Sequence, residues 1–164
     1  MAIPFHTVPW QEADQWKGVS YFFENIFKRF SYDQIHGLKA LTHEIDRAYG
    51  ELDIAMDGLC HGVCPACPDN CCARAQVYYD FKDLAFYYAR FSTLPGKQLV
   101  RPRKEACPML GPSGCRLSRN RRPFLCTWYL CPDLKRVGGR TLSIIEGLII
   151  EIKNYRSRLE DYFI

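Results

Sequence analysis

The sequence predicts a mostly α fold: a single domain of helices flanking an irregular, cysteine-rich centre. Apolar residues recur at helical spacing toward both ends of the chain. Between these stretches lie nine cysteines, in segments broken by proline and glycine that disfavour regular structure. A chain of 164 residues suits one compact domain. We therefore expect one domain over residues 1–164, with N-terminal helices (1–57), a cysteine-cluster region (58–132) and a C-terminal helix (140–163).

The N-terminal part is predicted to form two helices, or one helix with a break near Ser31. From Trp10 to about Leu52, apolar side chains follow one another at helical spacing. The pattern is carried by Val19, Phe22, Phe23, Ile26, Phe27 and Phe30, and then by Ile35, Leu38, Leu41, Ile45, Ala48, Tyr49 and Leu52. Asp33 is the expected N-cap of the second part, because a short acidic side chain accepts hydrogen bonds from free backbone N–H groups.

The first cysteine segment is expected to be irregular. Gly58, Gly62, Pro65 and Pro68 lie within or beside it, and residues of these two types interrupt helices and strands. Residues 97–139 should also be irregular, because they combine prolines, glycines and only short apolar pieces. Short strands are expected at most around Gln98–Val100 and Leu142–Ile145.

Two further helices are predicted. One should run from about Asp80 to Phe91, with Asp80 as its N-cap and Leu94–Pro95–Gly96 ending it. The last should run from Thr141 to Tyr162, with a capping box formed by Ser143 and Glu146. Its apolar stripe consists of Leu142, Ile145, Leu148, Ile149, Ile152, Tyr155 and Leu159.

Positive charge is concentrated in the later half of the chain. Residues 97–140 hold 11 Lys or Arg and 2 acidic residues, whereas the whole chain has a net charge of +4. Such a block suits an acidic protein partner or nucleic acid. Phe124, Trp128 and Tyr129 lie within it, where they either stack on bases or pack in the core. No apolar run approaches the roughly 20 residues that span a bilayer, so no membrane partner is expected.

The cysteines themselves indicate metal binding. Five of the nine fall within CHGVCPACPDNCC at residues 60–72, and the others are Cys107, Cys115, Cys126 and Cys131. The first residues of the chain lack the basic start and apolar stretch of a secretory signal, so we expect a cytoplasmic protein with reduced thiols. Clustered cysteines are then typical of metal ligands. Cys64 and Cys67 have the two-residue spacing of a common metal-chelating turn.

The run CPACPDNCC is followed by CPML, by GC and by RRPFLC. This order resembles the YkgJ-type cysteine cluster family, the CxxCxxCC proteins named for chelation of zinc or iron. Here three residues rather than two separate Cys67 from Cys71. The resemblance implies metal chelation by the cysteines of these motifs, without an assigned reaction. The matching positions are Cys64, Cys67, Cys71 and Cys72, then Cys107 with Leu110, then Cys115, then Arg122, Pro123 and Cys126.

The sequence leaves the cofactor open between zinc and an iron–sulfur cluster of the [4Fe–4S] type, since both take four thiolates. The crowded and uneven first run favours the cluster. Cys60, Cys64 and Cys67 also match the C-x-x-x-C-x-x-C spacing of radical S-adenosylmethionine enzymes, whose large βα barrel this sequence does not predict. His61 is a further candidate ligand, although a histidine in such a loop is more often solvated.

The sequence therefore predicts a metal-binding protein with a redox role or a role as accessory to an enzyme. Its ligands are drawn from Cys64, Cys67, Cys71, Cys72, Cys107, Cys115 and Cys126. We expect Cys72 rather than Cys71 to reach the metal, because adjacent residues rarely reach one ion together. The sequence contains no glycine-rich phosphate loop and no nucleophile-elbow motif, so catalytic residues stay unassigned.

The alternative hypothesis is a structural-zinc module that presents a basic surface to a protein or nucleic-acid partner. Arginines flank Cys115 and Cys126, where they can also offset the negative charge of a thiolate site. These residues are Arg116, Arg119, Arg121 and Arg122. Under this hypothesis, replacing the last three with Ala is expected to leave the protein folded and to remove the partner.

Overall fold

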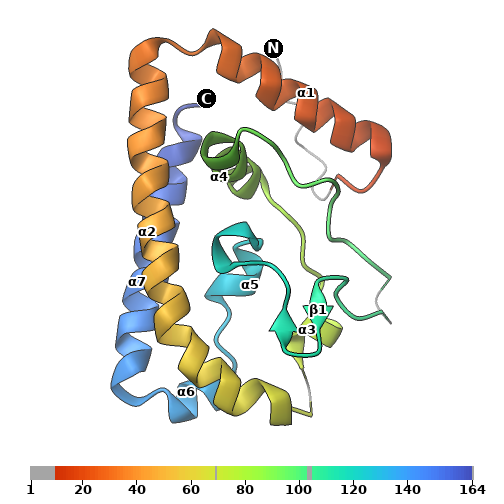
Figure 1. Cartoon of the computed structure of the whole chain (residues 1–164), viewed down its shortest axis with the longest axis vertical. Helices are drawn as coiled ribbons and strands as arrows, with labels where there is room; N and C mark the ends of the chain where they lie inside the picture. Colours follow the sequence, from red (N-terminus) through yellow and green to blue (C-terminus); the bar gives the residue numbers. More distant parts are fainter. Residues whose placement is uncertain (1–9, 69, 103–104, 164) are drawn as a thin grey trace.

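The computed structural model describes residues 10–68, 70–102 and 105–163, and the protein is mostly helical, as predicted (Figure 1). The described residues form helices α1 (Ala13–Arg29), α2 (Tyr32–Val63), α3 (Cys71–Arg74), α4 (Phe81–Phe91), α5 (Leu125–Trp128), α6 (Pro132–Val137) and α7 (Gly139–Glu160). Two 3-10 helices, η1 (Cys64–Ala66) and η2 (Arg119–Arg121), and one pair of two-residue strands, β1 (Leu110–Gly111) and β2 (Gly114–Cys115), complete them.

The predicted break between the N-terminal helices is confirmed, but the N-cap is Ser31 rather than Asp33. The Ser31 hydroxyl accepts a hydrogen bond from the Gln34 backbone N–H at 3.2 Å, and the Gln34 side chain accepts one from the Ser31 N–H at 2.9 Å. This reciprocal capping box satisfies two free donors at once. Asp33 lies inside the first turn, where its negative charge favours the helix N-terminus.

The prediction that the first cysteine segment is irregular was wrong. Helix α2 continues through Gly58 and Gly62 to Val63, and η1 and α3 follow it. A glycine inside a helix costs only about 1 kcal/mol relative to alanine. Buried Met56 and the partly buried Leu59 keep this end of α2 packed against the core, which offsets that cost. Cys60 therefore lies on a helix, and Cys64 follows directly at its end.

The core forms where α2, α4 and α7 meet. Helices α2 and α7 lie side by side and run antiparallel, and α4 packs against both (Figure 1). Their buried side chains include Ile45, Leu52, Leu84, Ile145 and Ile152. Helix α1 lies across one end of this core, where Phe23 stacks on Phe81 with 5.5 Å between ring centroids.

Helix α4 begins as predicted, and the two predicted strands are absent. Asp80 accepts a hydrogen bond from the Asp83 N–H at 2.7 Å, which makes it the N-cap. Residues 98–100 form no strand because a side chain supplies the pairing: the Gln98 amide bonds the Tyr79 N–H at 2.6 Å and the Tyr79 carbonyl at 3.0 Å. Residues 142–145 belong to α7.

The C-terminal helix is confirmed, but its predicted capping box is not. Helix α7 begins at Gly139 with Gly138 as N-cap and without a side-chain cap, directly after α6. Ser143 is thus an exposed residue inside the helix. The chain enters α7 from a preceding helix rather than from a loop, so no side-chain cap is needed at Ser143.

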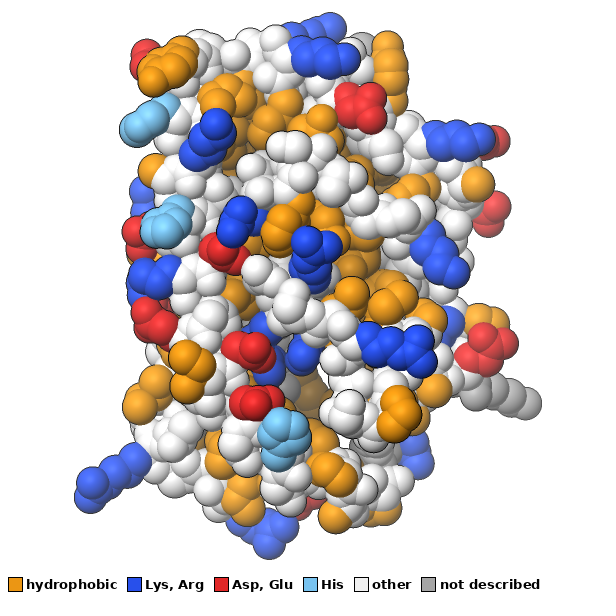
Figure 2. Space-filling view, viewed as in Figure 1, with side chains coloured by type: hydrophobic (Ala, Val, Ile, Leu, Met, Phe, Trp, Pro, Cys, Tyr) orange, Lys and Arg blue, Asp and Glu red, His pale blue; other side chains and the backbone are white. Residues whose placement is uncertain are grey.

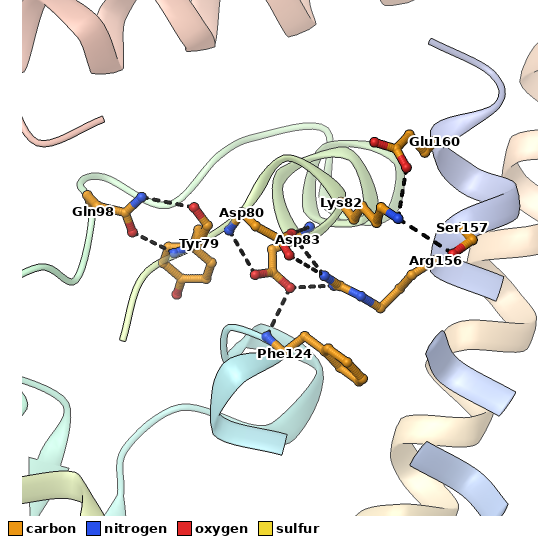
Figure 3. A network of polar contacts seen from close by, with 9 residues as sticks. All are labelled: Tyr79, Asp80, Lys82, Asp83, Gln98, Phe124, Arg156, Ser157 and Glu160. Carbon is orange, nitrogen blue, oxygen red and sulfur yellow. Dashed lines mark hydrogen bonds and ion pairs between the residues drawn. The ribbon is translucent and has the colours of Figure 1, made fainter. Parts of the chain in front are cut away.

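A buried ion network joins α4, α7 and the start of α5 (Figure 3). The guanidinium of Arg156 pairs with Asp83 and Asp80, and the Asp83 carboxylate also accepts the Phe124 N–H at 3.0 Å. The Arg156 and Asp83 side chains are only 3% and 4% exposed. Burial raises the pKa of Asp83 to about 6, while Arg156 and the two backbone N–H donors oppose this rise. Asp83 is therefore ionised at neutral pH.

Replacing Asp83 with Ala should lower the free energy of unfolding by about 3–5 kcal/mol, because it leaves a buried guanidinium without its main partner. Urea unfolding followed by circular dichroism measures this change. The matched control is Asp14→Ala, whose exposed carboxylate lies 3.7 Å from Lys17 and whose loss should leave stability nearly unchanged. Equal stability of the two variants would contradict the anchoring role of Asp83.

Candidate metal centre

All nine cysteines lie among the described residues, and no disulfide joins any two of them. Cys71 is exposed, and the other eight are partly buried. The elements that carry or adjoin them, which are the C-terminal end of α2, α3, the strand pair, α5 and α6, lie in the lower half of the view in Figure 1. Hydrogen bonds and the influence of the thiols on one another's pKa divide eight of the nine cysteines into two adjoining groups, and Cys67 belongs to neither.

The central thiol group consists of Cys72, Cys107, Cys115 and Cys126. Its first link is a backbone hydrogen bond of 2.9 Å from the Cys107 N–H to the Cys72 carbonyl. The buried guanidinium of Arg101 donates to the same carbonyl at 3.2 Å, and also to the carbonyls of Ala75 and Glu105. One arginine side chain thus fastens the two cysteine segments together.

A tight hairpin returns Cys115 toward Cys107. Leu110 pairs with Cys115 across the β1–β2 ladder, and the Leu110 N–H donates to the Cys107 carbonyl at 2.9 Å. Gly114 turns the hairpin with a φ of 111°, a conformation that residues with a side chain rarely adopt. The sequence CPMLGPSGC therefore folds so that its two cysteines lie on the same small motif.

Cys126 completes the central thiol group from α5. The Asp83 carboxylate accepts a hydrogen bond from the N–H of Phe124, which lies two residues before Cys126 (Figure 3). The buried ion network therefore positions the start of α5. Burial raises the pKa of the Cys126 thiol to about 12, with further contributions from Cys107 and Cys115. A hydrogen bond from Cys71, burial, and the neighbouring Cys126 and Cys115 raise the pKa of Cys72. Cys126 is thus near enough to Cys72, Cys107 and Cys115 for these thiols to influence one another's pKa.

The helix-end thiol group consists of Cys60, Cys64, Cys71 and Cys131. Burial, hydrogen bonding to Cys60, and the nearby Cys71 and Cys131 raise the pKa of Cys64 to about 12. The sequence-based ligand set contains Cys64 and Cys71 but not Cys60 or Cys131, which lie outside the recognised motifs. Cys67, which that set does contain, ends the η1 turn and donates its backbone N–H to the Cys64 carbonyl at 3.2 Å.

The donor chemistry of both groups fits a thiophilic metal centre. Four thiolates are the ligand set of structural zinc and of [4Fe–4S] clusters. Within the part of the chain that the structure describes, no three Cys, His, Asp or Glu side chains are arranged to hold one metal ion. The His61 side chain is exposed, and its Nδ1 lies 3.6 Å from an Asp57 carboxylate oxygen.

The arginines near the cysteines have internal partners. Arg119 is 5% exposed and its Nε lies 2.9 Å from Asp53 on α2. Arg121 lies over the Phe91 ring, 4.4 Å from its centroid, and Arg122 donates to the Leu117 carbonyl at 2.8 Å. Replacing the buried Arg119 with Ala would open a cavity beside Met56, so the expected triple Ala variant changes core packing as well as surface charge.

Basic side chains do not form one continuous patch on the face shown in Figure 2, where Lys and Arg alternate with acidic and apolar groups. Arg119 and Arg122 instead lie near the thiols. Burial raises the pKa of Cys60. The positive charges of Arg119 and Arg122 oppose this rise but do not cancel it. These two guanidiniums supply positive charge where a thiolate site would be negative.

No protein-family model matches the chain, and no solved structure matches it. Among the described residues, no helix combines the length and the apolar character needed to cross a membrane.

Arg101 and Asp83 are the positioning residues that sequence reasoning missed. Both are polar residues outside the cysteine motifs, and nothing in their local sequence marks them as buried. Their effect appears only once three distant segments meet: α4, the chain around Arg101 and α5.

Replacing Arg101 with Ala should speed hydrogen exchange at the Cys107 amide by at least about tenfold. The Cys72 carbonyl loses its second donor and the segment around Glu105 loses its clamp, so local opening becomes easier. Amide exchange measured by NMR tests this expectation. The control is Lys97→Ala, which removes an exposed cation from the same loop. Unchanged exchange in Arg101→Ala would show that the guanidinium does not hold the two segments.

Proposed function

We propose that the protein is a metal-binding protein whose central thiol group holds an iron–sulfur cluster of the [4Fe–4S] type. The observation that supports this proposal is that three separate segments carrying Cys72, Cys107 with Cys115, and Cys126 adjoin one another, through the Cys107–Cys72 backbone hydrogen bond, the β1–β2 hairpin and the influence of Cys107 and Cys115 on the pKa of Cys126. Four cysteine thiolates are the ligand set of such clusters. The same four positions belong to the YkgJ-type motifs, so the proposal includes membership of that family.

The surroundings of the group suit a redox or enzyme-accessory role. The positive charge of Arg122 favours a lower pKa at Cys126. The buried Tyr79 side chain lies near Cys115 and Cys126. Charge, burial and solvent exposure set the reduction potential of a cluster. A reducing compartment such as the cytoplasm, which we propose as the location, would keep the nine unlinked thiols available as ligands.

Zinc is the second candidate for the same four ligands. It is favoured by the scarcity of regular structure in the chain that carries Cys107 and Cys115, where the described residues from 92 to 118 contain only the two-residue strands β1 and β2. A structural zinc ion contributes directly to folding in such segments.

Replacing Cys126 with Ser should abolish cluster binding, because one of four thiolates is lost. Iron and acid-labile sulfide, measured on protein purified without oxygen, should fall to background together with absorbance near ~400 nm. The control is Cys67→Ser, which lies outside the central thiol group and should keep its cluster. Zinc lost from Cys126→Ser in place of iron and sulfide would favour the second candidate. A wild-type protein without metal would sink the proposal.

A partner-binding surface is a separate candidate role, favoured by two exposed aromatic side chains. Trp128 and Tyr129 are each 48% exposed and lie edge to face at 6.0 Å, and the exposed Lys135 and Arg136 of α6 follow them in the sequence. Exposed aromatics next to cations suit stacking on the bases of single-stranded nucleic acid.

Replacing both Trp128 and Tyr129 with Ala should weaken binding of a fluorescent single-stranded oligonucleotide by about tenfold or more, because base stacking is lost. Fluorescence anisotropy at two salt concentrations measures the affinity and its ionic part. Tyr21→Ala, which removes an aromatic side chain on α1 that is 66% exposed, serves as control. No binding by the wild-type protein, or equal binding by the double variant, would exclude this role.

A further inference from the structure

We infer that a pocket remote from the cysteines binds a short apolar peptide by its free amino and carboxyl termini. The pocket lies where α1 ends, α2 begins and the chain turns after α7, at the upper end of the view in Figure 1. Its volume of about 670 Å³ falls within the range of roughly 300–1,000 Å³ that is usual for small-molecule sites. The site shares no residue with either thiol group, so it goes beyond the proposed function.

The floor of the pocket is apolar and already packed. It includes Ile26 of α1, Phe30 and Phe163, and Phe163 is only 7% exposed. The Phe163 ring contacts the rings of Phe30 and Phe23, with 5.5 Å and 5.7 Å between ring centroids. These contacts hold the floor in one arrangement. An apolar ligand side chain therefore gains by covering it without first having to order it.

Tyr162 forms a wall of the pocket, and its position depends on a glycine. The side chain packs against the core from the turn after α7. A β-carbon at Gly37 of α2 would collide with the Tyr162 hydroxyl. The absence of a side chain at Gly37 therefore allows Tyr162 to lie close against α2 and to shape this side of the pocket.

The rim carries two opposite charges that the fold leaves without partners. Arg29 and Asp161 line the pocket and are exposed, and neither side chain forms an ion pair or a hydrogen bond with any described residue. Gln34 also lines it. The Gln34 Oε1 accepts the Ser31 N–H at 2.9 Å, which leaves the Nε2 donors without a partner among the described residues. One segment thus offers donors at Arg29 and Gln34, and the other offers an acceptor at Asp161.

This arrangement of charge matches a ligand that carries both charges itself. A carboxylate suits Arg29 and Gln34, an ammonium group suits Asp161, and apolar side chains suit the floor between them. A fatty acid would satisfy Arg29 but bring its negative charge toward Asp161. In a single amino acid both charges lie on one carbon atom, whereas Arg29 and Asp161 are too far apart to pair. A peptide separates its termini by roughly 3.3–3.6 Å per residue.

NMR titration of the full chain with the dipeptide leucyl-phenylalanine tests this inference. Signals of the Gln34 side-chain amide and the Phe163 backbone amide should shift, while the Trp128 indole signal should not. The matched ligands are the same dipeptide with its amino end acetylated or with its carboxyl end amidated. Each block removes one charge and keeps the apolar groups, so each should weaken binding about threefold or more.

Variants assign each charge to its partner. Arg29→Gln should weaken binding of the free dipeptide as much as amidation does, and amidation should then have no further effect. Asp161→Asn should show the same relation to acetylation. Gly37→Ala should weaken all three ligands alike, because it displaces Tyr162 rather than a charge. The control Lys28→Gln removes an exposed neighbouring cation that does not line the pocket, and it should leave the affinity unchanged.

Three results would overturn the inference. The first is a wild-type protein whose Gln34 and Phe163 signals do not respond to the dipeptide. The second is equal affinity for the free and the blocked dipeptides, which would reduce the site to a non-specific apolar contact. The third is a loss in Lys28→Gln as large as that in Arg29→Gln, which would reduce the effect to overall charge. None of these results depends on metal content, so the proposed function stands or falls separately.

Discussion

The buried pair of Asp83 and Arg156 is the interaction on which the arrangement of the cysteines depends. It joins α4 to α7, and through the Phe124 N–H it fixes the start of the helix that carries Cys126. Burying two charges is costly unless each finds several partners. Here the carboxylate accepts from Arg156, Asp80 and Phe124, and the guanidinium also reaches Asp80. The packing of α4 against α7 therefore helps to set the position of Cys126.

The helices were predictable where one face of the chain is apolar, and less so where local rules compete with packing. The break near Ser31, helix α4 and helix α7 all follow from apolar spacing and capping residues. The continuation of α2 through Gly58 and Gly62 does not, because packing against the core outweighs the local cost of glycine. The strand expected at Gln98–Val100 fails for a similar reason: the pairing at Tyr79 comes from the Gln98 side chain rather than from a neighbouring strand.

The sequence indicates cysteine as the residue type of the candidate site, but it predicts only in part which cysteines lie near one another. Cysteine spacing indicates metal binding, yet it cannot show that Cys131 lies near Cys64, because that proximity depends on α6 packing against α2. It also cannot separate Cys71 from Cys72, since only the fold leaves Cys71 exposed and buries Cys72 in part. Arg101 and Asp83, which position the cysteine segments, do not belong to any recognisable sequence motif.

The raised thiol pKa values explain how so many cysteines can lie together in one fold. Burial and neighbouring thiols raise the pKa of Cys64 and Cys126, which favours the neutral, protonated form of both thiols in the absence of metal. Neutral thiols do not repel one another, whereas thiolates at these distances would. In the proposed metal site, a metal ion or cluster would displace protons from its thiol ligands, and its positive charge would replace them in neutralising the sulfur. Protons and metal then compete for the same sulfur atoms, so metal occupancy should fall in acid.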